Sequence, residues 1–164
     1  MLNTETVRIA DQLRRALSGN AWHGSPLSEL LANVNAEQAA ARPVPTAHSI
    51  WELVLHIEVW AHAALGATKG TPMAKIVGTE EDWRSAGNGA AAWTSAQERL
   101  FSTGEQLAKA IEEFGDDRLK EIVPGRKYDF YHLFHGIVQH SLYHGGQIAL
   151  VKKAASSVAA VRPA

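Results

Sequence analysis

The chain has 164 residues, 46% of them hydrophobic and 20% charged, which is ordinary for a globular protein of one domain. Sixteen basic residues stand against seventeen acidic ones without any basic block, so nucleic-acid binding has no electrostatic support. There is no cysteine, which excludes disulfides, thiolate metal ligands and a cysteine nucleophile.

The N-terminal residues do not form a secretion signal, because charged residues are dispersed among the apolar ones over 1–17. No segment approaches the roughly 20 consecutive apolar residues of a membrane span. We therefore expect a cytoplasmic protein that does not enter a membrane.

The first helical pattern covers residues 3–17, where apolar residues recur at helical spacing. Thr4 is its candidate N-cap, and Gly19 can end the helix in the left-handed conformation. Ser25 before Pro26 then predicts a short helix over 27–34, because proline suits the first helical turn.

The second long helix is expected over residues 49–68. Its cap is Ser49 or the earlier Thr46, since either hydroxyl can accept a backbone N–H bond. We favour Ser49, because Glu52 stands three residues later and completes a capping box. His56 lies beside the apolar stripe of this helix.

A long link follows up to residue 88, with Trp83 as its expected anchor. Two further helical patterns cover 90–114 and 130–155, separated by a turn at 124–125. No useful β-alternation is present. Four long helices with two long connections predict an all-α fold, a four-helix bundle with crossover links.

We expect residues 1–155 to form a single helical domain. Residues 156–164 are rich in small side chains, and we expect them to form a frayed C-terminal tail.

Two histidines in the last helical pattern stand four residues apart, at His140 and His144. Residues at this spacing share one face of a helix, and their ring nitrogens can converge on one divalent cation. The pair falls in an apolar stripe that should face the core, formed with Leu133, Ile137, Ile148 and Val151. Spacing alone leaves two interpretations open, a metal site and a pair of core histidines.

The remaining histidines lack this relation. His135 precedes His140 by about 500° of helical rotation, which points it elsewhere and favours a structural or interface role. His48, just before the second long helix, belongs to the capping region or lines the mouth of a site. His23, His62 and His132 are interpreted as surface or packing residues.

Three stretches of the sequence resemble the DinB/YfiT-like superfamily. They are Ala21-Trp22-His23-Gly24-Ser25-Pro26 with the following LSELL, the run from His48 to His56, and the run from Phe134 to Leu150. They occur in the expected order and span nearly the whole chain.

The resemblance implies a metal-binding helical bundle whose second and fourth long helices supply His56, His140 and His144. It implies one divalent ion, nickel or zinc, with water completing the coordination. Relatives include thiol-dependent transferases and isomerases that use low-molecular-weight thiols, and others are described only as metal-dependent hydrolases. A homodimer is implied as well.

Two polar residues lie close to these histidines in the sequence. Glu52 stands one turn before His56, where it can support the site or simply be solvated, and we do not expect it to bind the metal directly. Gln147 stands three residues after His144 and can bond a water on the metal.

Three neutral nitrogens leave a cation with its full charge and with open positions. Such a site can activate water for hydrolysis or a thiol for transfer to an electrophile. The leading hypothesis is therefore a metal-dependent enzyme acting on a small molecule. The alternatives are a non-catalytic metal-binding stress-response protein and a helical interaction module with histidines in its core.

Overall fold

The computed structural model describes residues 4–161, with side chains as far as Ser156, and this part of the chain is all-α as expected. One isolated bridge, between Ile122 and Asp129, is the β pairing found in it. In the same range no helix is both long and apolar enough to span a bilayer. The helices are α1 (Glu5–Leu17), α2 (Leu27–Leu31), α3 (Ala36–Ala40), α4 (Ile50–Thr68), α5 (Gly89–Glu112), the 3₁₀ helix η1 (Asp116–Arg118) and α6 (Phe130–Val161).

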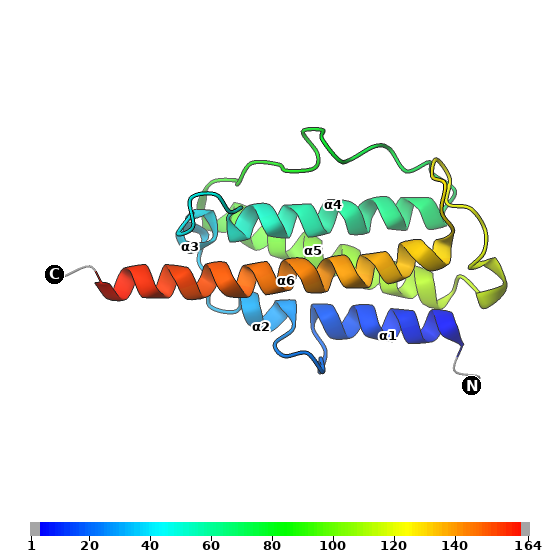
Figure 1. Cartoon of the computed structure of the whole chain (residues 1–164), viewed down its shortest axis with the longest axis horizontal. Helices are drawn as coiled ribbons and strands as arrows, with labels where there is room; N and C mark the ends of the chain where they lie inside the picture. The colour runs from blue at the N-terminus through cyan, green and yellow to red at the C-terminus, as the bar shows by residue number, and fades with distance from the viewer. Residues whose placement is uncertain (1–3, 162–164) are drawn as a thin grey trace.

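The four long helices lie side by side (Figure 1). α5 packs against α1 and α4, and α6 packs against the same two helices. α1 and α6 run in one direction along the long axis, and α4 and α5 run in the other. This arrangement brings α4 and α6, the two helices with the predicted metal ligands, into direct contact.

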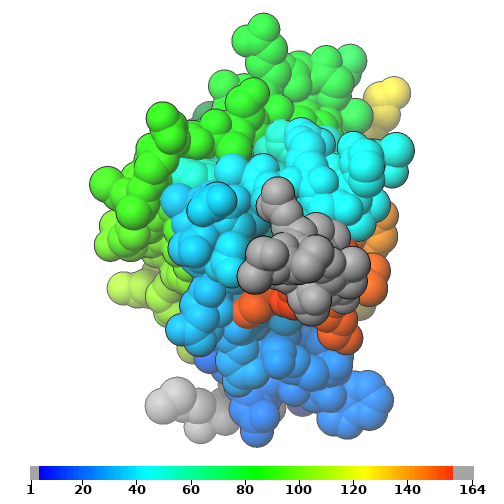
Figure 2. All heavy atoms as spheres, turned by 90° about the vertical axis from the view of Figure 1, so that its left-hand side faces the viewer, coloured from blue at the N-terminus to red at the C-terminus, as the bar shows by residue number. Residues whose placement is uncertain are grey.

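The link of residues 69–88 joins α4 to α5 and runs back along the length of α4 (Figure 1). It passes very close to α4 at Gly87, where an added Cβ would lie 2.8 Å from Cζ2 of Trp51. A larger residue at this position would therefore push the link away from the helix. At the end of the molecule shown in Figure 2, the link lies beside the segment that carries α3 and the start of α4.

The first half of α4 is enclosed on all sides. Every residue from Ile50 to Glu58 is buried, including the polar Glu52 and His56. The indole of Trp51 packs against that of Trp93 on α5, and Trp93 donates its N–H to the carbonyl of Val34. Each Å² of buried apolar surface stabilises the fold by roughly 25 cal/mol. The many buried apolar side chains of α4 therefore make this helix the centre of the core.

The expected cap of α4 is present. The Ser49 hydroxyl accepts the Glu52 N–H at 3.2 Å, and the Glu52 carboxylate accepts the Ser49 N–H at 2.9 Å. Thr4 occupies the N-cap position of α1, but its side chain makes no capping bond. The carboxylate of Asp116 accepts the N–H groups of Glu5 and Thr6 instead.

Two expected boundaries differ from those in the structure. The short helix after Pro26 ends at Leu31, and Pro26 itself is the N-cap, so Ser25 lies outside the helix. α6 continues to Val161, past the point where we expected the tail to begin, and residues 162–164 lie outside the described part.

The contributions of the α4 and α1 caps to stability can be compared by mutation. We expect Ser49→Ala to lower the free energy of unfolding by about 1 kcal/mol, because a buried backbone N–H loses its acceptor. Thr4→Ala should change it by less than about 0.5 kcal/mol, since no capping bond is removed. Urea denaturation followed by circular dichroism measures both, and equal losses would contradict the assignment.

Candidate metal centre

Three histidines that are far apart in sequence meet between α4 and α6. His56 comes from α4, and His140 and His144 come from successive turns of α6. One ring nitrogen from each lies within 4.8 Å of the others. Nε2 of His56 and Nε2 of His140 are 2.9 Å apart. The structure therefore brings together the three residues that the sequence suggested as ligands, and it is the one such cluster found in residues 4–156.

The cluster is largely buried, and burial favours the neutral form of its histidines. The side chains of His56 and His144 are buried, whereas His140 is half-buried. Burial, together with the neighbouring His144 and His56, lowers the pKa of His140 to about 3. The pKa values of His56 and His144 are also lowered, chiefly by burial. Neutral imidazole is the form that binds metal ions.

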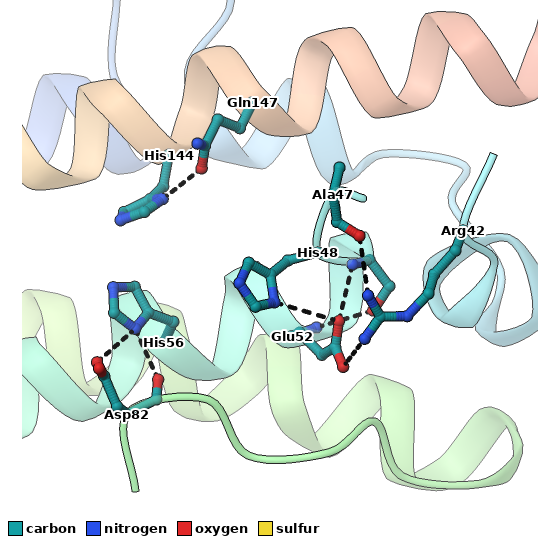
Figure 3. Close-up of polar contacts among 9 residues, drawn as sticks. Arg42, Ala47, His48, Glu52, His56, Asp82, His144 and Gln147 are labelled. Carbon is teal, nitrogen blue, oxygen red and sulfur yellow. Dashed lines mark hydrogen bonds and ion pairs between the residues drawn. The ribbon is translucent and has the colours of Figure 1, made fainter. Parts of the chain in front are cut away.

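The ring of His56 is oriented by the link of residues 69–88. Its Nδ1 lies 2.7 Å from the backbone oxygen of Asp82 (Figure 3). Because a carbonyl oxygen can only accept, Nδ1 carries the hydrogen and Nε2 keeps its lone pair. Oδ1 of Asp82 lies 3.3 Å from the same Nδ1. A carboxylate or carbonyl behind a ligand histidine is the usual arrangement in metal sites.

His144 is oriented in the same way by its own helix. Its Nδ1 lies 2.6 Å from Oε1 of Gln147 (Figure 3). The amide oxygen accepts, so Nε2 of His144 keeps its lone pair and points away from Gln147. Gln147 therefore orients the ring of His144, and the bond to a water on the metal that we expected from it stays a prediction.

Trp83 packs against the face of the His56 ring. Its ring stacks on His56 with centroids 3.9 Å apart and on His48 with centroids 3.5 Å apart, both nearly parallel. Trp83 therefore anchors the link as expected, and its anchor points are two histidine rings. His48 supports the site through Trp83, and its Nδ1 lies 3.7 Å from the carboxylate of Glu52.

Glu52 does not reach the cluster. Its carboxylate caps α4 at Ser49 and forms an ion pair with Arg42, whose guanidinium also donates to the carbonyl of Ala47 (Figure 3). Glu52 therefore holds the segment before α4 in place and does not contact the rings of the three histidines.

The other histidines lie elsewhere. His135 points away from the cluster, against Tyr131 and 3.4 Å from the carboxylate of Glu5. His62 and His23 are exposed. His132, which we interpreted as a surface or packing residue, is exposed but lines the cavity beside the cluster.

These donors fit a divalent cation. His56 and His144 each present an unprotonated Nε2, and Nε2 of His140 lies directly against that of His56. Two lone pairs at this distance repel one another, so the contact requires either a hydrogen on Nε2 of His140 or a cation shared by both rings. Imidazole nitrogens suit zinc and nickel alike.

A cavity of about 500 Å³ opens at the cluster, within the range of about 300–1,000 Å³ that is usual for small-molecule sites. All three histidines line it. The other lining residues come from α4, from the link, and from the first half of α6 with the turn before it: Trp60, Val77, Asp82, Trp83, Tyr128, His132, Leu133, Gly136, Ile137 and Tyr143.

The fold and the cluster define an all-α protein with a three-histidine centre between two of its long helices. The family model of the DinB superfamily matches residues 21–148, and the chain belongs to this family. The matched region contains all three histidines and the whole link. The comparisons with curated proteins and with solved structures gave no match.

Acidification should destabilise the metal-free protein. An unfolded histidine binds a proton near pH 6.5, whereas folded His140 does so only at about 3. The unfolded state therefore binds more protons between these values, and the free energy of unfolding should fall as the pH falls below about 6.5. The measurement is urea denaturation in chelator at several pH values.

A matched pair of variants isolates this effect. His140→Gln removes one of the titrating groups and should make the pH dependence less steep, with His56 and His144 still contributing. His62→Gln, at an exposed position on α4, should leave it as in the wild type. Parallel curves for His140→Gln and the wild type would show that this histidine does not contribute.

Proposed function

We propose that this protein binds one divalent metal ion, zinc or nickel, through His56, His140 and His144, and that it is a metal-dependent enzyme acting on a small molecule. One observation carries the proposal. Three neutral ring nitrogens converge at the wall of a cavity, two of them with their other nitrogen fixed by an acceptor. Structural zinc sites usually have four protein ligands, whereas three ligands beside a cavity are typical of catalytic ones.

The bound cation would supply Lewis acidity that activates water for hydrolysis or a thiol for transfer to an electrophile. The chain's own residues prepare the site for either reaction. Asp82 and Gln147 keep two imidazoles in the tautomer that binds metal, and the Trp83 ring excludes water from one face of His56. The cavity favours an enzyme over a protein that only stores metal, because storage needs no space for a substrate.

The finer description of the fold is part of the same proposal. The mutual packing of α1, α5, α4 and α6 supports a four-helix bundle of the DinB type with long crossover links. We also propose a cytoplasmic location and, from the family resemblance, a homodimer.

Metal content tests the proposal directly. Untagged protein, loaded with zinc or nickel and desalted, should carry about one ion per chain by mass spectrometry. His140→Ala and His144→Ala should lose it, and His62→Ala should keep it. Circular dichroism confirms that each variant is folded. A folded wild type that binds neither metal would leave the helical interaction module as the interpretation.

The activity assays separate the two reactions. Metal-loaded protein is offered a low-molecular-weight thiol with an electrophile, and separately a panel of esters and amides. Turnover that requires the thiol indicates transfer, and turnover without it indicates hydrolysis. Stoichiometric metal without turnover in either assay would favour a non-catalytic metal-binding protein.

The contact of Gln147 with His144 yields a further prediction. Gln147→Ala removes the acceptor that fixes the His144 ring and should weaken zinc binding by about 10- to 100-fold. Gln139→Ala, at an exposed position five residues before His144 on the same helix, is the control and should bind normally. Competition with a chromophoric chelator measures both affinities, and equal affinities would contradict the role of Gln147.

A further inference from the structure

The cavity beside the three histidines extends along α6 well beyond them. His132, Gly136, His140 and His144 all line it, and each stands four residues after the one before. A helix rises by about 1.5 Å per residue, so His132 lies about 12 Å before His140 along the axis of α6. The cavity therefore has two ends, one at the candidate metal ligands and the other at a fourth histidine, which the proposed function does not use.

The wall around Gly136 is apolar. A Cβ added at Gly136 would meet no atom within 4 Å, so this position of the helix leaves open space. Leu133 and Ile137 line the cavity beside it on α6, and Trp60 and Val77 line it from α4 and the link. Open space bounded by apolar side chains suits the apolar body of a small ligand.

His132 offers a hydrogen-bond donor at its end of the cavity. The residue is exposed, and its ring lies against that of Tyr128 with centroids 5.1 Å apart. Imidazole carries an N–H in both its neutral and its charged form, so it can donate to an acceptor on a ligand. Because His132 is exposed, a polar group beside it can keep part of its hydration.

The end at the three histidines suits a group that binds metal. The proposed ion would keep open positions there, and thiolate, carboxylate or hydroxamate groups can occupy them. No lysine or arginine is found among the described residues that line the cavity. An anionic group on a ligand would therefore pair with the ion at this end.

From this layout we propose that the cavity binds an elongated small molecule with two polar ends. One end coordinates the ion, the apolar middle lies over Gly136, and an oxygen acceptor such as a carboxylate at the other end accepts the N–H of His132. The inference rests on the proposed function, because it needs the ion at the first end. His132 then selects substrates by the end that does not react.

Three hydroxamates test the layout on zinc-loaded protein. Acetohydroxamate has the metal-binding group alone, octanohydroxamate adds an apolar chain, and suberic acid monohydroxamate ends a chain of the same length in a carboxylate. Calorimetric titration at about pH 7 should show octanohydroxamate binding at least about tenfold more tightly than acetohydroxamate, because its chain buries apolar surface.

Replacing His132 tests the far end. His132→Ala should weaken the binding of suberic acid monohydroxamate by about 3- to 10-fold and leave octanohydroxamate binding almost unchanged. His62→Ala removes another exposed histidine, which does not line the cavity, and should bind both probes as the wild type does. No loss for the carboxylate probe in His132→Ala, or an equal loss for both probes, would overturn the role of His132.

Two glycines on α6 provide a matched pair for the middle. An added Cβ would meet no atom within 4 Å at Gly136, which lines the cavity, or at Gly146, which does not. Gly136→Leu should reduce octanohydroxamate binding to the level of acetohydroxamate, whereas Gly146→Leu should retain the difference between them. Circular dichroism confirms that both variants are folded. Octanohydroxamate bound as tightly by folded Gly136→Leu as by the wild type would contradict the proposed position of the chain.

Metal content separates this inference from the proposed function. Zinc is measured in each sample by mass spectrometry before and after the titration. A protein that takes up no zinc would reject the proposed function and this inference with it. A full zinc content, with octanohydroxamate bound no more tightly than acetohydroxamate, would overturn the inference and leave the metal site standing.

Discussion

The contact between the 69–88 link and His56 is the constraint on which the rest of the site depends. The carbonyl of Asp82 determines which nitrogen of His56 carries the hydrogen, and Trp83 determines the plane of the ring. Without both contacts, a histidine on a buried helix could rotate or exchange tautomers, and its Nε2 would not face that of His140. The long crossover is therefore part of the candidate site as well as a connection between two helices, and it also passes close to α4 at Gly87.

The same link accounts for what the sequence could and could not predict. The four long helices follow from apolar periodicity, and the shared face of His140 and His144 follows from their spacing, since both are local properties of a helix. The Asp82 carbonyl has no such signal, because any residue has a backbone oxygen and the link has no period. Trp83 stood out as an anchor because a large aromatic residue in a polar link needs a place to pack, but its histidine partners depend on the tertiary fold.

The starts of the helices show the same difference between features that the sequence could predict and features that it could not. The cap of α4 could be predicted because Ser49 and Glu52 stand three residues apart and satisfy each other's backbone. The cap of α1 could not, because its acceptor, Asp116, is more than one hundred residues away in sequence. Thr4 had the right residue type at the right position, and a distant carboxylate takes its place. Local patterns therefore identify where a helix begins more reliably than they identify the group that caps it.

Placing three neutral histidines, two of them buried and one half-buried, between α4 and α6 has a cost in stability. Each imidazole loses hydration, and the facing Nε2 atoms of His56 and His140 gain no favourable contact unless a proton or cation lies between them. A shared cation would remove this repulsion and stabilise the folded state in proportion to its affinity. The helices hold the rings in place through an extensive apolar core around α4, so the site can remain assembled before a metal arrives. A site assembled in advance loses less conformational entropy when it binds, which would favour tight binding of the proposed ion by three ligands and would leave its other coordination positions open.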